Sequence, residues 1–327
     1  MREDEDVFAN DGAGLSVDFA EPVFAVALTG SITDTRLVVG SLNYDEKTPS
    51  NWISLLEAQN GSLLMQKYCK QHTFAPTKLL WHPESINSTE FFASTADCLR
   101  LFRVTESKEI ECCAELKNTH YPQISAPYTS FDWSPFKPNF ICCSSIDCTC
   151  TIWDIEQQRI YKQVMAHNKE AMDISFSKDS SFFATVGADR TLRLFDLRDL
   201  SKCSMIYEAT QPLLRVAFNQ RSTYIAITLM NTFEVYILDY RRPSSILYEL
   251  KYHKGPVSAI EWSPDDPDSI CSIAEDSKAH LWKIENTGQR AIQPLLEYSS
   301  EQPMVNLAWN RSNAELISIV KHKRSEE

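Results

Sequence analysis

Apolar strands recur along this chain at a regular spacing, and polar turn residues bound each of them. The copies lie roughly 40 to 50 residues apart, which is the period of a four-stranded propeller blade. Each copy opens with an apolar strand whose last large residue is Leu28, Trp81, Trp133, Phe176, Phe218, Trp262 or Trp309. A second apolar strand follows in every copy, and a third strand follows in most. The pattern therefore predicts an all-β fold, a seven-bladed β-propeller.

The stretch from Phe182 to Leu200 shows how one copy is built. It contains a short apolar strand, a polar turn centred on Asp189 and a second strand of alternating residues that stops at Asp196. One hairpin cannot bury its apolar face alone, so the copies must stack against one another.

The final copy is expected to be incomplete. After Leu316 to Val320 the chain continues as KHKRSEE, which has no apolar run for a third strand. A propeller normally avoids an open edge by pairing its last blade with a strand from the other terminus. We therefore expect the alternating stretch 14–19 to pair beside residues 316–320. This predicts one propeller over residues 14–320, between a disordered acidic tail (1–13) and a disordered charged tail (321–327).

Two copies carry matching sets of polar residues. An aspartate in the turn can accept hydrogen bonds from turn amides and hold a polar side chain from the preceding connection. The predicted tetrads are His167, Thr185, Asp189 and Phe195 in the fourth copy, and His253, Ser272, Asp276 and Trp282 in the sixth.

A histidine, a serine and an aspartate together also suggest a hydrolase. The set occurs twice, however, whereas a catalytic triad is needed once, and no GxSxG elbow presents a nucleophile. Cys148 and Cys150 suggest a metal, but no second cysteine pair or histidine at ligand spacing accompanies them. We therefore expect structural tetrads, with no catalytic residue, metal or cofactor.

Composition and charge narrow the function classes. Apolar residues make up 43% of the chain, which is enough to fill a core. The net charge of −12 and the pI near 5.1 oppose direct binding to a nucleic-acid backbone. The N-terminus lacks an apolar signal core, and no run approaches the roughly 18 apolar residues that span a bilayer. We expect a protein of the cytoplasm and nucleus without membrane contact.

The polar set and the strand endings resemble the WD40 repeat. Trp153-Asp154 is the one intact WD pair, and Phe195-Asp196, Leu238-Asp239 and Trp282-Lys283 stand in its place elsewhere. The resemblance implies a WD40 β-propeller.

Several phrases are similar to one subfamily, the Transparent Testa Glabra and anthocyanin-regulator type of WD40 scaffold. They are PTKLLW (76–81), LRLFRV (99–104), APYTSFDW (126–133), SSIDCTCTIW (144–153), AHNKE (166–170), VGAD (186–189), FDLR (195–198) and PLLR (212–215). The resemblance implies a non-enzymatic platform. Plant members join helix-loop-helix and Myb-type regulators, whereas animal members bind dual-specificity tyrosine-regulated kinases and belong to the cullin-4 adaptor-associated factors.

Two turns contain charged side chains that could bind a partner protein. Asp196-Leu197-Arg198 and Asp239-Tyr240-Arg241 are similar to the DxR box with which some propellers dock on the cullin-4 adaptor, although the tryptophan of the full box is absent. The alternative is an Asp–Arg pair that only caps a turn. On the opposite face we expect a second, weaker set of contact residues: Lys169, Glu170, Arg190, Phe233 and Lys278.

The favoured function is a non-enzymatic, monomeric scaffold that brings together kinases or transcription regulators. The alternative is a substrate receptor of a cullin-4 RING ubiquitin ligase that docks through the DxR turns. A third class, a propeller hydrolase, would need acids or a metal gathered at the central channel, whereas the aspartates here are spaced at turns.

Overall fold

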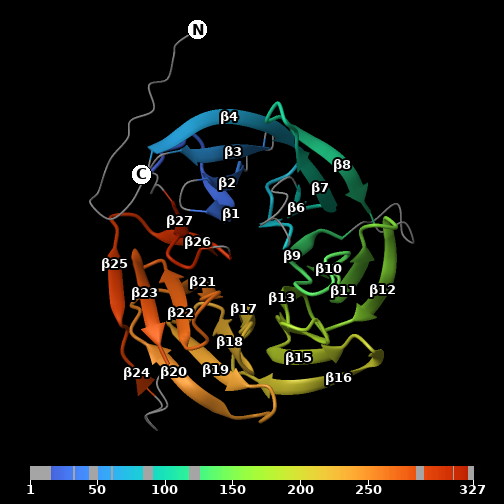
Figure 1. Cartoon of the computed structure of the whole chain (residues 1–327). Helices are drawn as coiled ribbons and strands as arrows, with labels where there is room; N and C mark the ends of the chain where they lie inside the picture. The colour runs from blue at the N-terminus through green and yellow to red at the C-terminus, as the bar shows by residue number, and fades with distance from the viewer. Residues whose placement is uncertain are drawn as a thin grey trace.

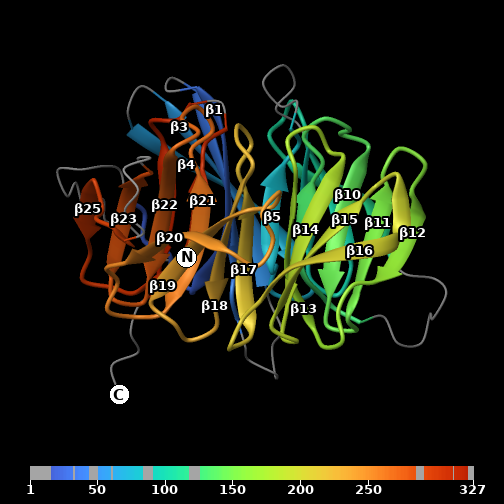
Figure 2. The ribbon, with the colours of Figure 1, turned by 90° about the horizontal axis from the view of Figure 1, so that it is seen from below.

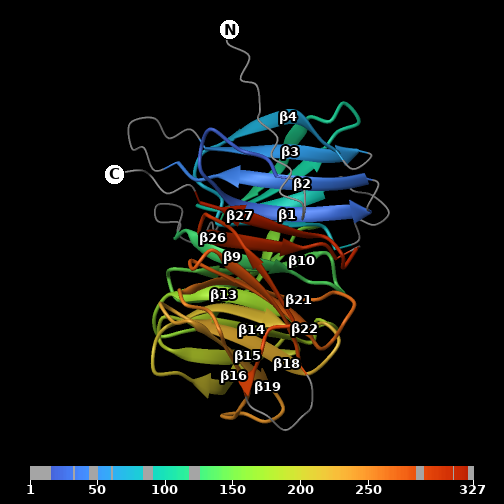
Figure 3. The same ribbon diagram turned by 90° about the vertical axis from the view of Figure 1, so that its left-hand side faces the viewer.

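A computed structural model describes residues 16–31, 34–43, 51–59, 62–83, 91–117, 126–284, 291–311 and 313–322. Their strands form antiparallel sheets arranged in a ring about a central axis, and the first strand of each sheet lies nearest that axis (Figure 1). Figures 2 and 3 show the ring from two sides, with the strands running from one face to the other.

Each sheet is built from strands that are consecutive in the chain. The innermost strands are β1 (Val23–Ser31), β5 (Lys78–Trp81), β9 (Tyr128–Trp133), β13 (Ala171–Phe176), β17 (Leu213–Phe218), β21 (Val257–Trp262) and β26 (Met304–Trp309). The second strands are β2 (Asp34–Ser41), β6 (Phe91–Thr95), β10 (Phe140–Ser145), β14 (Phe182–Gly187), β18 (Tyr224–Leu229), β22 (Ser269–Ala274) and β27 (Ile317–Lys321).

The outer strands complete six of these sheets, which we call blades one to six in chain order. The third strands are β3 (Asn51–Gln59), β7 (Leu99–Val104), β11 (Thr149–Asp154), β15 (Thr191–Asp196), β19 (Glu234–Asp239) and β23 (Lys278–Lys283). The fourth strands are β4 (Ser62–His72), β8 (Ile110–Leu116), β12 (Arg159–Met165), β16 (Asp199–Glu208), β20 (Ile246–Lys251) and β25 (Leu296–Ser299). The short β24 (Ala291–Ile292) adds to blade five, parallel to β20.

The burial of each strand follows from its place in the ring. Neighbouring sheets cover both faces of the second strands, so β22 is buried at all six positions. The fourth strands lie at the rim, and most residues of β16 are exposed. Apolar clusters fill the space between sheets; one joins Ile152 of blade three to Phe176 and Phe183 of blade four. The core is therefore a ring of interfaces between blades.

The expected seven-bladed ring is wrong in one respect: the described residues form six blades, and the last copy forms only the two-stranded sheet β26–β27. The physical reason lies in the sequence after β27, where charged residues replace the apolar run that a third strand would need. The predicted closing strand is also wrong where it can be judged. Residues 16–19 lie outside any strand, and Gly14 and Leu15 lie outside the described residues.

In place of that closing strand, side chains attach the two-stranded sheet β26–β27 to blade one. Phe19 packs against Trp52, with ring centroids 5.5 Å apart, beside an apolar cluster shared by blade one and β26–β27. Asn310 Nδ2 donates to the carbonyl of Gly30 at 2.8 Å. The two-stranded sheet is thus held in the ring by apolar packing and by bonds to backbone carbonyls.

Hydrogen bonds between a side chain and the backbone connect every neighbouring pair of innermost strands. Such bonds satisfy backbone groups that face a neighbouring blade. Around the ring they are Trp81 Nε1 to Ala27 O (3.1 Å), Thr77 Oγ1 to Tyr128 O (3.2 Å), Thr129 Oγ1 to Ala171 O (2.6 Å), Val216 N to Asp173 Oδ2 (3.0 Å), Arg215 Nε to Ser258 O (3.1 Å), Ser258 Oγ to Met304 O (2.8 Å) and Asn306 Nδ2 to Phe24 O (2.9 Å). The ring is thereby closed.

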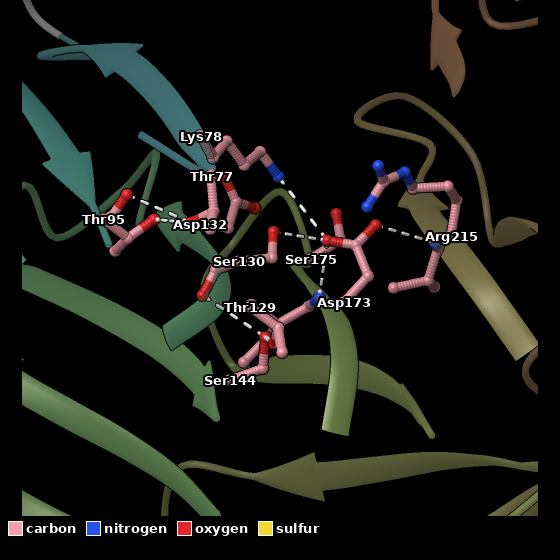
Figure 4. A network of polar contacts seen from close by, with 12 residues as sticks. Thr77, Lys78, Thr95, Thr129, Ser130, Asp132, Ser144, Asp173, Ser175 and Arg215 are labelled. Atoms are coloured by element: carbon pink, nitrogen blue, oxygen red, sulfur yellow. Dashed lines mark hydrogen bonds and ion pairs between the residues drawn. The ribbon is translucent and has the colours of Figure 1, made fainter. Parts of the chain in front are cut away.

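Asp173 is the centre of the part of this network drawn in Figure 4. Its carboxylate accepts a hydrogen bond from Ser130 Oγ at 2.6 Å and lies 3.7 Å from Lys78 Nζ. Lys78, Ser130 and Asp173 come from blades two, three and four, and Val216 of blade five also donates to Asp173, so this one carboxylate links four blades.

Candidate functional site

The antiparallel strands give the ring two faces with different turns. The tetrad face holds the turns between second and third strands, including Asp189 and Asp276. The DxR face holds the turns between third and fourth strands, including Arg198 and Arg241. The two sets of predicted contact residues therefore lie on opposite faces.

In blade six the structure brings all four predicted tetrad residues together. His253 Nδ1 lies 3.2 Å from Asp276 Oδ2, and His253 Nε2 lies 2.8 Å from Ser272 Oγ. Trp282 Nε1 donates to the same hydroxyl at 2.8 Å. Asp276 also accepts the backbone N–H of Lys254 at 2.7 Å, which fixes the connection before β21. Burial lowers the pKa of His253 to about 4, so its imidazole is neutral near pH 7.

In blade four the same arrangement has two substitutions. His167 Nδ1 lies 2.9 Å from Asp189 Oδ1, and His167 Nε2 lies 3.3 Å from Thr185 Oγ1. Phe195 has no N–H to donate; it stacks on Phe183 instead, with centroids 5.0 Å apart. Thr185 Oγ1 therefore donates to a backbone carbonyl, that of Asp173, at 3.0 Å.

An arginine completes the polar set of blade four. Arg193 Nη2 lies 3.1 Å from Asp189 Oδ2, and its Nη1 donates to Ala166 O at 3.1 Å. Burial would raise the pKa of Asp189, but hydrogen bonds from the Asn168 backbone and Thr191 hold it below its usual range. Burial likewise lowers the pKa of His167.

A third histidine of this type, which sequence reasoning missed, is His72 at the end of β4, and it contacts blade two. His72 Nε2 lies 3.0 Å from Ser94 Oγ. Its Nδ1 faces the carbonyl of Phe74, and Asp97 of the turn accepts a hydrogen bond from Arg100 Nη1 at 2.6 Å. The signal in the sequence was weak, because the offset from histidine to serine is longer here than in blades four and six.

The serine of the blade six tetrad cannot act as an exposed nucleophile. Ser272 is fully buried, and its oxygen takes the N–H of Trp282. The described tetrads thus have the geometry of structural hydrogen-bond networks within a blade, in which each polar group is the hydrogen-bond partner of another.

The two DxR turns have the same internal geometry. Arg198 donates through Nε and Nη2 to Asp196, at 2.9 and 2.6 Å, and the backbone N–H of Arg198 also donates to that carboxylate, at 2.9 Å. Arg241 repeats this on Asp239 at 3.1 and 2.9 Å. Hydrogen bonding to Arg198 lowers the pKa of Asp196 to about 2. Each turn is therefore capped by its own ion pair.

Both arginines nevertheless face solvent. Their side chains are 75% and 63% exposed, whereas that of Asp239 is only 5% exposed. An aromatic bridge connects the two turns: the guanidinium of Arg198 lies 5.9 Å from the Phe182 ring centroid, and that ring lies 6.2 Å from the ring of Tyr240. The structure thus joins both turns into one surface on neighbouring blades.

Four of the predicted residues of the opposite face are exposed, and the fifth, Lys278, is half-buried. Lys169 and Glu170 lie in the connection before β13, and the side chain of Phe233 is exposed before β19. Arg190 lies 4.0 Å from Glu208, and Lys278 pairs with Glu297. Arg190 also has a positive φ of 69°, in the tight turn after Asp189.

No helix in the described part of the chain has the length and apolar character needed to cross a membrane.

A family model and two similar proteins agree in relating the chain to the WD40-repeat proteins. The model described as "WD domain, G-beta repeat" matches residues 111–154, 158–196 and 244–283. A "DDB1- and CUL4-associated factor 7 homolog" of Dictyostelium discoideum is 35% identical over 289 residues, which are 87% of this chain and 88% of that protein. An uncharacterised WD repeat-containing protein of Schizosaccharomyces pombe is 31% identical over 303 residues, which are 84% of this chain and 70% of that protein.

Proposed function

Because this chain belongs to the WD40-repeat family, we propose that it is a non-enzymatic scaffold that holds partner proteins on its two faces. The closed ring of side-chain to backbone bonds supports this function, since a rigid frame keeps two bound partners at a fixed separation. Partners held on one frame gain effective concentration relative to one another.

The DxR face is proposed to bind the adaptor of a cullin-4 ubiquitin ligase. The Dictyostelium relative carries this association in its name. The observation that supports it best in this chain is the pair of exposed arginines, Arg198 and Arg241, on neighbouring turns of one face. With a substrate protein on the opposite face, the chain would act as a substrate receptor.

The ion pairs within the turns favour docking more than stability. An exposed ion pair contributes little to folding, typically below about 1 kcal/mol. It does hold each guanidinium in one orientation before a partner arrives, which lowers the entropic cost of binding. Because Asp196 and Asp239 engage Nε and Nη2, the second terminal amine of each arginine is directed to a partner's carbonyl or carboxylate groups.

The tetrad face is proposed to carry the other partners. Dual-specificity tyrosine-regulated kinases and helix-loop-helix or Myb-type regulators are those that the narrower likeness to the Transparent Testa Glabra type implies. Lys169, Arg190 and Phe233 offer charge and an aromatic ring for such contacts. Action in the cytoplasm and nucleus, as a monomer, belongs to the same proposal.

The test is affinity purification of the tagged full chain from cells, followed by mass spectrometry, with R198E/R241E compared with wild type. We expect the double variant to lose the cullin-4 adaptor by at least tenfold while kinases or transcription regulators stay bound. R159E on the DxR face and R190E on the tetrad face serve as matched charge controls, and R159E should keep the adaptor. Equal recovery of the adaptor with R198E/R241E would refute docking through these turns.

A further inference from the structure

A buried histidine beside the blade six tetrad has no hydrogen bond. His280 of β23 is fully buried, and neither ring nitrogen has a hydrogen-bond partner among the described residues. Its ring centroid lies 4.3 Å from that of His253 and 5.6 Å from that of Trp282. A buried polar group left unsatisfied costs about 1 to 3 kcal/mol, so natural structures rarely retain one without a function.

The strand register shows what other blades place at this position. His280 lies opposite Ser272, just as Arg193 lies opposite Thr185 in blade four and Arg100 lies opposite Ser94 in blade two. Both arginines bind the aspartate of their own turn, at 3.1 Å in blade four and 2.6 Å in blade two. Blade six therefore has an imidazole where two other blades have a guanidinium cation.

The carboxylates that such a cation would neutralise are still present in blade six. In blade two, Arg100 bridges Asp97 of the turn and Glu115 of the fourth strand. In blade six, Asp276 occupies the turn, and Glu297 is the cross-strand partner of His280, with Oε2 3.8 Å from Nδ1. Two imidazoles and the carboxylate of Asp276 thus lie together, and the carboxylate of Glu297 lies next to His280.

We propose that His253, Asp276 and His280 form a binding site for a divalent transition-metal ion, with Zn²⁺ preferred and Glu297 beside the fourth position. Ligand atoms of the first three residues already lie within 4.8 Å of one another. Imidazole and carboxylate are suitable Zn²⁺ ligands, at bond lengths near 2.0 Å. Such bonds place tetrahedral donors roughly 3.3 Å apart, so the site must contract by about 1.5 Å at most.

The tetrad can remain intact while the metal is bound. The Nδ1 atom of His253 faces Asp276, and its Nε2 faces Ser272 Oγ. Ligation through Nδ1 leaves Nε2–H to donate to the Ser272 hydroxyl, so the other ring nitrogen keeps a hydrogen-bond partner that orients the ring. The metal ion would replace only the direct contact between His253 and Asp276.

One charge opposes this site. Lys278 Nζ pairs with Glu297, beside the proposed fourth position. Its side chain is 31% exposed and can swing into solvent, which frees the carboxylate for the metal. Removing the ammonium should therefore strengthen binding, whereas loss of a surface charge elsewhere should not.

The experiment is titration of the chelator-treated full chain with Zn²⁺ alone, followed by calorimetry, with Co²⁺ absorption as a second probe of four-coordinate geometry. All proteins carry C112S/C113S, because Cys112 and Cys113 are exposed neighbours and cysteine thiolates are suitable Zn²⁺ ligands. We expect one equivalent to bind, and H280R to abolish that event. H280R introduces the arginine used by blades two and four, so its fold should be preserved.

K278M should bind Zn²⁺ about tenfold more tightly, and K254M, which removes a neighbouring exposed lysine, serves as its control. Equal stoichiometry and affinity in wild type and H280R would overturn the site. If H280R does not fold, K278M decides: an affinity equal to that of wild type and K254M would overturn it. Absence of binding below about 10 μM in wild type would do so as well.

Discussion

Blades four and six have the same hairpin and tetrad frame, but they differ at both ends. At the tetrad end, Arg193 forms an ion pair with Asp189 in blade four. His280, at the same position in blade six, makes no hydrogen bond to any described residue. At the DxR end, blade four presents the exposed Arg198, whereas blade six ends in Lys283, paired with Asp266 across its own sheet.

This comparison separates scaffold residues from residues available to a partner. The frame needs a buried histidine, a hydroxyl and an aspartate, because each satisfies a group that would otherwise be unpaired. Residues of the DxR turns constrain the fold less, since an exposed ion pair adds little to stability. The same residue type, aspartate, is therefore part of the buried frame at position 189 and orients the exposed Arg198 at position 196.

The largest expected effect comes from the buried aspartate of blade four. D189A removes the partner of His167, Arg193 and two turn amides, so it should lower the free energy of unfolding by about 3–5 kcal/mol. D196A, in the same blade, should lower it by less than about 1 kcal/mol. Chemical denaturation of both variants measures the difference. Equal losses would show that burial does not separate the two roles.

Acid should destabilise blade six more steeply than a blade without a buried histidine. The pKa of His253 falls from 6.5 in the unfolded chain to about 4 in the folded state, so the unfolded state binds more protons between these values. The stability that the neutral His253 contributes is fully present above about pH 6.5, falls as the pH drops and is lost below about pH 4. It amounts to roughly 3 kcal/mol at most.

Denaturation of wild type and H253Q at several pH values tests this prediction. The gap in stability between the two proteins should shrink toward pH 4, because the glutamine cannot take up a proton. H167Q is the matched variant in blade four, where burial also lowers the histidine pKa. A gap that stays constant with pH would contradict a neutral, buried imidazole.

A smaller effect distinguishes the tetrad hydroxyls. S272A removes the partner of Trp282 Nε1 and His253 Nε2, whereas T185V removes that of His167 Nε2 and of the Asp173 carbonyl, because Phe195 donates nothing. A carbonyl tolerates the loss of a partner better than an N–H does. Each unsatisfied group costs about 1 to 3 kcal/mol, so S272A should be the more destabilising change. The midpoints of thermal unfolding give the order. The reverse order would mean that Trp282 contributes no hydrogen bond to its blade.

Much of the fold could be predicted from the sequence, because the apolar period directly reflects blade packing. Six of the seven innermost strands end at the large residue that marked them, for example Trp133 and Phe176, whereas β1 runs past Leu28 to Ser31. The six-bladed outcome could not be predicted in this way. Whether residues 16–19 pair as a strand depends on packing around Phe19 and Trp52, which periodicity does not encode.

The candidate site could be predicted only where its residues recur at a fixed spacing in the sequence. Fixed offsets pointed to the tetrads and to both DxR turns, which the structure places as two buried networks and one exposed surface. The offset was too irregular to reveal His72, and His280 fits no ligand motif, because its partners come from three different segments. The aromatic bridge from Phe182 to Tyr240 depends on contact between blades, which no local pattern contains.

The most direct test of the account is the affinity of the purified chain for purified cullin-4 adaptor, measured by calorimetry for wild type, R198E, R241E and R198E/R241E. We predict that each single change weakens binding at least tenfold and the double change at least a hundredfold, while the midpoint of thermal unfolding stays within about 2 °C of wild type. An unchanged Kd in the double variant, with the fold intact, would contradict docking through the DxR face.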